Sequence, residues 1–161
     1  MDLSFFALGK FCENQAGNQF IKQPINLITS LIFFISALAI YRLLQKTKTN
    51  SKPVFIVLLT LTVVAGIGNL LMHLTPNPYF YLLDIGSLLI FFITGSIYYL
   101  YFQQVHLKEV GLLFFLLILS IVFKYVDSNF CHLFPLGTHF LLHISIPFAM
   151  YKLVTFLLLK L

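Results

Sequence analysis

Long apolar segments, separated by short polar stretches, dominate this sequence of 161 residues. Each segment has close to the roughly 20 residues that an α-helix needs to cross the hydrocarbon core of a membrane. There are about five such segments, one for each expected span. They cover residues 25–44, 54–75, 78–102, 110–126 and 136–159. We therefore predict an all-α fold, a polytopic bundle of about five transmembrane helices.

The balance of apolar and charged residues supports the same fold class. The chain is 60% hydrophobic and 9% charged, whereas soluble domains carry about 25% charged residues. A soluble fold could not cover its surface with so few charges, so much of the apolar surface must meet lipid. The length leaves room for one compact domain over residues 1–161. Residues 1–10 contain Asp2 and lack a basic start, so no cleavable signal peptide is expected.

The polar stretches predict where helices begin and end. Pro53 is compatible with the first turn of the second span, because a proline there loses no helical hydrogen bond. Asn77 is a candidate cap for the third span, with Pro78 at its first helical position. The segment 127–135 is predicted to be a loop between the fourth and fifth spans. Pro147, within the fifth span, predicts a kink.

The distribution of lysine and arginine predicts the orientation. These residues cluster after the first span, after the third span and at the C-terminal end: Arg42, Lys46, Lys48, Lys52, Lys108, Lys152 and Lys160. The loop between the second and third spans has none, although Lys10 and Lys22 precede the first span. Since cytoplasmic loops carry the excess of positive charge, the C-terminus is expected inside and the N-terminus outside. The net charge of +5 thus reflects membrane orientation, and no nucleic-acid partner is expected.

A small group of ionisable residues falls inside the expected spans. His73 lies at the end of the second span, Asp84 near the start of the third, and His139 and His143 near the start of the fifth. Such groups are costly in a membrane, which makes each one a candidate functional residue. The predicted orientation places all four at one depth, near the extracytoplasmic face. His139 and His143 are four positions apart and share one helix face, as do Asn69 and His73.

Three histidines with one open position are typical of a catalytic zinc site. A neighbouring carboxylate such as Asp84 could orient a bound water and take its proton. A lone His-x-x-x-His more often marks two polar residues that line a helix contact, and it is the co-location with Asp84 that favours a metal. A haem with two axial histidines is a further interpretation, less favoured because more ligands cluster than it needs. His106 and His132 fall in loops, where ordinary interfacial residues are expected.

The same residues resemble the motifs of the alkaline ceramidase family. This family belongs to a wider superfamily of membrane hydrolases and progestin/adiponectin-type receptors. The superfamily pattern is Ser-x-x-x-His at the end of one helix, Asp early in the next, and His-x-x-x-His in the last. Residues 66–73 (GIGNLLMH), 82–84 (LLD) and 137–143 (GTHFLLH) follow that order. Residues 11–14 (FCEN) and 24–27 (PINL) resemble the family's Trp-Cys-Glu segment and its Trp-Asn-Thr helix start.

The resemblance implies a zinc-dependent amidohydrolase with a single ceramidase-like domain. His73, His139 and His143 would hold the metal, and Asp84 would position the attacking water and act as its base. Asn69, which stands where the family has serine, would help to stabilise the oxyanion. The substrate would be a membrane lipid of the ceramide type, cleaved at its N-acyl amide to a sphingoid base and a fatty acid.

Departures from the family pattern limit what the resemblance implies. The family usually has seven helices, and about five are expected here. Lys10 and Gln23 stand where calcium-binding members have acidic residues, which leaves only Glu13 and argues against a calcium site. The family has cysteines at places comparable to Cys12 and Cys131, which implies a disulfide; two unlinked thiols are the alternative.

Two further functions remain open at this stage. The receptor branch of the superfamily shares the metal pattern, so a non-enzymatic receptor or sensor could retain zinc for stability. Hydrolysis of another lipid amide or of an ester would use the same residues.

Overall fold

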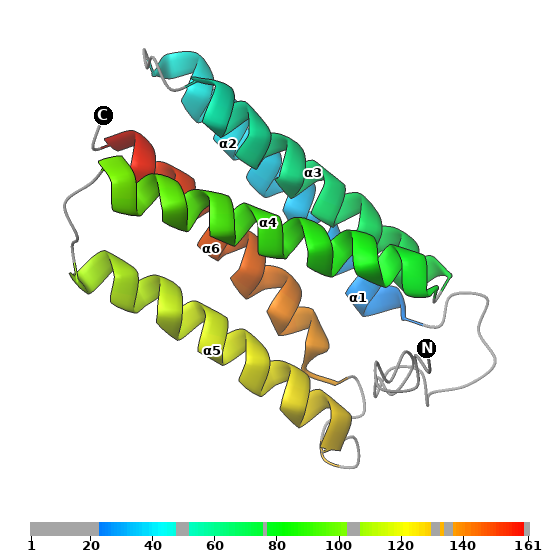
Figure 1. Ribbon diagram of the computed structural model, residues 1–161. Coiled ribbons are helices and arrows are strands. Elements are labelled where there is room, and N and C mark those ends of the chain that lie inside the picture. Colours follow the sequence, from blue (N-terminus) through cyan, green and yellow to red (C-terminus); the bar gives the residue numbers. More distant parts are fainter. Residues whose placement is uncertain are drawn as a thin grey trace.

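The computed structural model describes residues 23–47, 52–75, 77–102, 107–129, 133 and 137–159. These residues form helices and no strand. The helices are α1 (Pro24–Ser30), α2 (Ile32–Lys46), α3 (Lys52–Leu74), α4 (Pro78–Phe102), α5 (Leu107–Asn129) and α6 (His139–Leu159). The protein is therefore an all-α transmembrane bundle, as the apolar segments predicted (Figure 1).

Four candidate membrane spans are found among the described residues. They are Pro24–Lys46, Lys52–Leu74, Pro78–Tyr101 and His139–Leu158, which correspond to the first, second, third and fifth expected spans. The count is thus four where about five were expected. The remaining expected span, residues 110–126, lies within the 23-residue helix α5, and its crossing of the membrane stays a prediction. The chain is a multi-pass membrane protein, and the face on which each end lies also stays a prediction.

The first expected span is found as one candidate span, Pro24–Lys46, with a single turn residue inside it. α1 ends at Ser30 and α2 begins at Ile32, with Leu31 between them at φ −62° and ψ −19°. These dihedral angles are helical, so the turn at Leu31 does not end the span.

The predicted starts of the second and third spans are confirmed. Pro53 is the second residue of α3, and α4 begins at Pro78. The backbone N–H of Tyr79 donates to Asn77 Oδ1 at 2.9 Å, so Asn77 caps α4. Pro147 lies inside α6, and the kink expected there stays a prediction.

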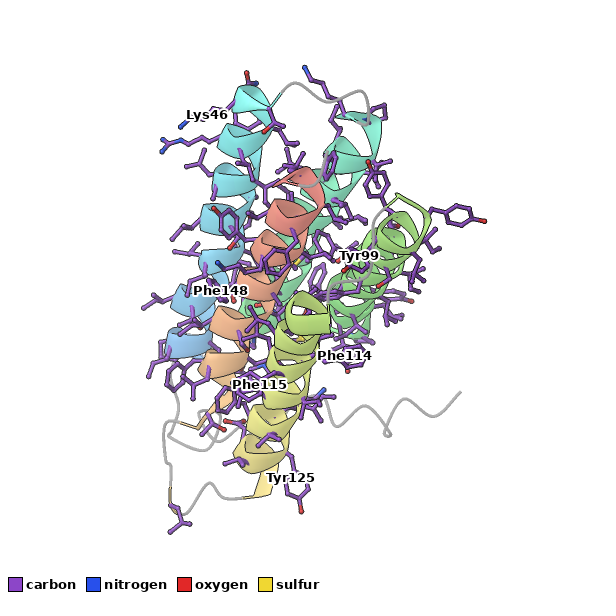
Figure 2. The ribbon with its side chains drawn as sticks, turned by 90° about the vertical axis from the view of Figure 1, so that its left-hand side faces the viewer. Lys46, Tyr99, Phe114, Phe115, Tyr125 and Phe148 are labelled. Carbon is purple, nitrogen blue, oxygen red and sulfur yellow. The ribbon has the colours of Figure 1, made fainter. Side chains whose placement is uncertain are left out.

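Helix α6 occupies the centre of the bundle. It contacts α1, α2, α3, α4 and α5, and Figure 1 shows it between α5 and the α2–α3 pair. The buried core is formed by large apolar side chains, among them Phe33, Phe55, Phe91, Met150 and Leu157. On the outside, Phe114 and Phe115 of α5 and Phe148 of α6 are exposed, as expected for side chains that meet lipid (Figure 2).

Two glycines bring α3 close to its neighbours, and both lie just before the site. A Cβ on Gly66 would stand 2.9 Å from Phe33 Cβ in α2. A Cβ on Gly68 would stand 2.7 Å from the backbone nitrogen of Asp84 in α4. Only glycine permits these approaches without displacing backbone. The close contact of α3 with α4 brings Asp84 beside the end of α3.

Candidate metal centre

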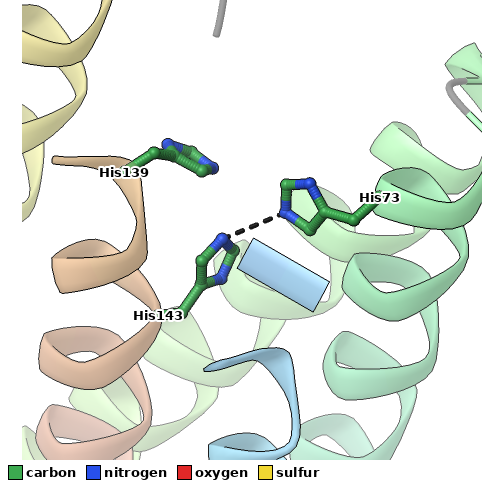
Figure 3. A group of neighbouring side chains, drawn as sticks. All are labelled: His73, His139 and His143. Atoms are coloured by element: carbon green, nitrogen blue, oxygen red, sulfur yellow. Dashed lines mark hydrogen bonds between the residues drawn. The ribbon is translucent and has the colours of Figure 1, made fainter. Parts of the chain in front are cut away.

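The three predicted histidines meet at one end of the bundle. His73 lies in the last turn of α3, His139 is the first residue of α6, and His143 follows one turn later. One ring nitrogen of each lies within 4.8 Å of the others, and all three side chains are buried. His73 Nε2 and His143 Nε2 are 3.0 Å apart. Figure 3 shows the three rings turned toward one another. The structure thus brings together residues that are up to 70 positions apart.

The spacing of these nitrogens fits a small cation. With zinc–nitrogen bonds of about 2.0–2.1 Å, two tetrahedral ligands stand roughly 3.3 Å apart. The 3.0 Å pair is close to that value, and one nitrogen of each of the three histidines lies within 4.8 Å of the others. Imidazole nitrogen is a usual zinc ligand, and three of them leave one coordination position open. A haem fits poorly, because a porphyrin cannot be placed between nitrogens 3.0 Å apart.

Gln23 orients the first of these histidines. Its side-chain oxygen Oε1 is hydrogen-bonded to His73 Nδ1 and also accepts from Asn26 Nδ2 at 3.3 Å. Because an amide oxygen can only accept, Nδ1 carries the proton and Nε2 keeps its lone pair for a ligand. Histidine ligands are commonly held in this way by a second hydrogen bond. Gln23 is buried, with 1% of its surface exposed.

From the sequence, Gln23 stood out only as a position where calcium-binding members of the family have an acidic residue. Its contact with His73 joins positions 50 residues apart, so no local motif indicated it. Lys10 and Glu13, the other residues of that comparison, lie outside the described residues. A calcium site is accordingly not proposed.

Asp127 anchors the start of α6, where His139 stands. Its Oδ1 accepts from the backbone N–H groups of Thr138 (2.7 Å) and His139 (3.0 Å). Thr138 Oγ1 in turn donates to the carbonyl of Phe123 at 2.8 Å. These bonds satisfy helix-terminal donors, as an N-cap does, although the acceptor belongs to another helix. Gly137 precedes them at φ 75°, a conformation that favours glycine.

The predicted loop over residues 127–135 was wrong for residues 127–129, which are helical; residue 133 lies in a turn, and the rest of that segment lies outside the described residues. Helix α5 continues through Asn129, and α6 begins at His139 rather than near residue 136. Asp127 is buried, with 2% of its surface exposed. A carboxylate at that depth is tolerated because α6 supplies N–H donors for it. The residue type suggested a loop, and only the packing of α5 against α6 reveals the cap.

Asp84 is held by a chain of hydrogen bonds that crosses three helices. Ser30 Oγ of α1 donates to Asn69 Oδ1 of α3 at 2.5 Å, and Asn69 Nδ2 donates to Asp84 Oδ2 of α4 at 3.0 Å. All three side chains are buried. The second carboxylate oxygen, Asp84 Oδ1, is buried and has no hydrogen-bond partner among the described residues. This oxygen is thus placed to accept a proton.

The bonds of Asn69 clarify its position beside the cavity. The sequence left open whether Asn69 acts on an oxyanion or only bonds a neighbouring helix. The structure shows the bonds to Ser30 and Asp84. The amide nitrogen of Asn69 carries two N–H donors, and one of them bonds Asp84. A contact of the other N–H with an oxyanion stays a prediction.

A cavity of about 70 Å³ joins Asp84 and Asn69 to His139. Its other lining residues are mostly apolar: Phe33, Met72, Tyr81, Ile85, Leu88, Lys124, Leu142 and Ile146. Pockets for whole drug-sized ligands usually have about 300 Å³ or more. The cavity is therefore too small for a whole ligand of that size.

The remaining candidates lie outside the described residues. They are His106, His132, Cys12 and Cys131. The disulfide between the two cysteines stays a prediction.

Comparison with known proteins adds no relative. No protein family, no curated protein and no solved structure matches this chain. The resemblance to alkaline ceramidases accordingly depends on the histidine, aspartate and N-terminal motifs alone. The arrangement of the buried residues is the further observation that bears on function.

Proposed function

We propose that this chain is a zinc-dependent lipid amidohydrolase embedded in the membrane and similar to alkaline ceramidases. It would cleave the N-acyl amide of a ceramide-type lipid to a sphingoid base and a fatty acid. The observation that carries the proposal is the cluster of three buried histidine nitrogens within 4.8 Å of one another, one of which, His139, lines a cavity together with Asp84.

The histidines would hold the metal, and the neighbouring residues would handle protons. Zinc bound by His73, His139 and His143 would supply Lewis acidity, which activates water and polarises a carbonyl. Asp84 would take the proton of the attacking water on Oδ1 and later pass it to the leaving amine. Its other oxygen is fixed by Asn69, so the carboxylate is oriented before the substrate arrives.

Asn69 would serve the reaction in two ways. One N–H of its amide bonds Asp84, and the second would donate to the carbonyl oxygen of the substrate as negative charge develops there. Ser30 fixes the amide by donating to Asn69 Oδ1. A hydrogen-bond donor held in this way costs little reorganisation during the reaction.

The surroundings of the site favour a lipid as the substrate. The cavity is lined mostly by apolar side chains, and it lies within a bundle whose outer surface is apolar. These apolar surroundings would suit the acyl chain of a lipid better than a polar substrate. With the predicted orientation, the reaction would take place near the extracytoplasmic face.

A non-enzymatic receptor or sensor is the second candidate. The small cavity, about 70 Å³, and the complete burial of His73 and His143 favour it, because a metal in so closed a place can serve stability alone. Hydrolysis of another lipid amide or of an ester would take place in the same small cavity.

The two candidates differ in turnover. Zinc-loaded protein in lipid nanodiscs should release fatty acid and sphingoid base from an N-acylsphingosine, as followed by mass spectrometry. A chelator should abolish release and added zinc should restore it. Asp84→Asn should keep the metal but lower the rate by roughly 10²–10⁴, as expected for the loss of a general base. Stoichiometric zinc without cleavage of any lipid amide or ester would instead favour the receptor.

A further inference from the structure

A lysine stands at the edge of the cavity that contains Asp84. Lys124 belongs to α5, and its ammonium donates to the Tyr81 hydroxyl at 3.4 Å. The same nitrogen lies 5.5 Å from the centre of the Tyr81 ring. Both residues line the cavity together with Asn69, Asp84 and His139. A cation and a phenol therefore border a mostly apolar cavity beside the proposed reaction centre.

Lys124 brings a positive charge to the cavity. Charged residues within membrane helices are costly, and those retained usually mark a substrate path or have a charged partner. Lys124 donates to the neutral Tyr81 hydroxyl, and its charge also acts on the Asp84 carboxylate across the cavity. The Lys124 side chain is exposed, so its other N–H donors can reach a ligand.

The spacing along α4 shows how a ligand would be placed. Tyr81 and Asp84 are three positions apart on one helix, so their Cβ atoms are roughly 5–6 Å from each other. Because Lys124, Tyr81 and Asp84 also line one cavity of about 70 Å³, a group bound by Lys124 and Tyr81 would lie near a carbonyl that faces Asp84. An anion is the group that an ammonium and a phenol hydroxyl bind best together.

We infer that Lys124 and Tyr81 bind an anionic group of the substrate, a carboxylate or a phosphate close to the amide. Acidic N-acyl lipids are then better substrates than neutral ones of the same chain length. The part of this inference that concerns cleavage rests on the proposed hydrolase function, whereas the binding of the anion rests on the cavity and its lysine.

Two pairs of probes test the inference with zinc-loaded protein in nanodiscs of neutral phosphatidylcholine. N-palmitoylglycine and N-palmitoylethanolamine differ by a carboxylate against a hydroxymethyl group; ceramide 1-phosphate and ceramide differ by a phosphate. The anionic member of at least one pair should have the higher kcat/KM, and the pair that responds identifies the anion. In Lys124→Met that advantage should fall roughly 10- to 100-fold, mainly through KM, as for a lost charge-assisted hydrogen bond.

The controls separate charge from folding. Lys124→Arg should keep most of the preference, which is compared as the ratio of kcat/KM within each pair. Lys152→Met is the matched control, because the Lys152 ammonium also lies over an aromatic ring, at 5.4 Å from Phe148, outside this cavity. It should leave both pairs unchanged. An equal preference in the parent and Lys124→Met, or no preference for either anion in the parent, would overturn the inference.

A binding measurement distinguishes failure of this inference from failure of the proposed function. N-palmitoylglycine should raise the unfolding temperature of Asp84→Asn more than N-palmitoylethanolamine does, because a ligand of the folded state stabilises it. The difference should vanish when Lys124→Met is added. If no amide is cleaved but this difference is present, the anion site stands and the hydrolase proposal fails. Equal shifts with both probes would refute the anion site, whatever the activity.

Discussion

Replacing Gln23 by leucine should weaken metal binding without touching a metal ligand. Gln23 Oε1 accepts from His73 Nδ1, and both side chains are almost fully buried. Leucine has a similar size but no acceptor, so the ring N–H would lose this partner in a place that water cannot easily reach. A buried donor left unsatisfied costs about 1–3 kcal/mol, which corresponds to roughly 5- to 150-fold in affinity. Partners of metal-bound histidines typically contribute about 10- to 100-fold.

The zinc affinity of purified protein, measured by competition with a chromophoric chelator, gives this quantity. We expect Gln23→Leu to raise the dissociation constant by roughly 10- to 100-fold. Gln23→Glu, which keeps an acceptor, should stay close to the parent. Gln45→Leu is the matched control, because Gln45 is exposed at the other end of α2. An unchanged affinity in a folded Gln23→Leu protein would refute the role assigned to this hydrogen bond.

Three other substitutions test the packing around the site. Gly68→Ala places a Cβ 2.7 Å from the Asp84 backbone nitrogen and should lower the unfolding free energy by about 1–3 kcal/mol. In the control Gly86→Ala the new Cβ meets nothing within 4 Å, so the unfolding free energy should stay the same or rise by up to about 1 kcal/mol. Denaturant unfolding in detergent compares the two variants. Asp127→Ala removes the acceptor at the start of α6 and should cost roughly 1–2 kcal/mol and lower zinc retention, with Asp127→Asn milder in both assays. Asn69→Ala should cut the turnover of a lipid amide by roughly 10²–10³ at unchanged zinc content, with Asn69→Ser intermediate; turnover equal to the parent would leave Asn69 a packing residue.

The helices could be predicted because their signals are local. A run of about 20 apolar residues predicts a span wherever it occurs, and Asn77 followed by Pro78 predicts the start of α4 from two neighbouring residues. The turn at Leu31 was not predicted, because hydropathy does not report a change of backbone hydrogen bonding at a single residue. The fourth expected span, residues 110–126, lies in α5. The charged residues Lys124 and Asp127 stand near the C-terminal end of this helix.

The site could be predicted only as far as depth and helix face allow. His139 and His143 share a face by their spacing, and span order places His73 and Asp84 at the same depth. Hydrogen bonds between helices leave no such pattern. The contact of Gln23 with His73 and the cap that Asp127 forms on α6 depend on the rotation and packing of separate helices, which periodicity does not specify.

The metal content of the purified protein tests the central claim most directly. Elemental analysis should find about one zinc per chain, as expected for three histidines with one open position. His139→Ala or His143→Ala should each remove most of it. Stoichiometric zinc retained in the double variant His139→Ala/His143→Ala would contradict the metal centre.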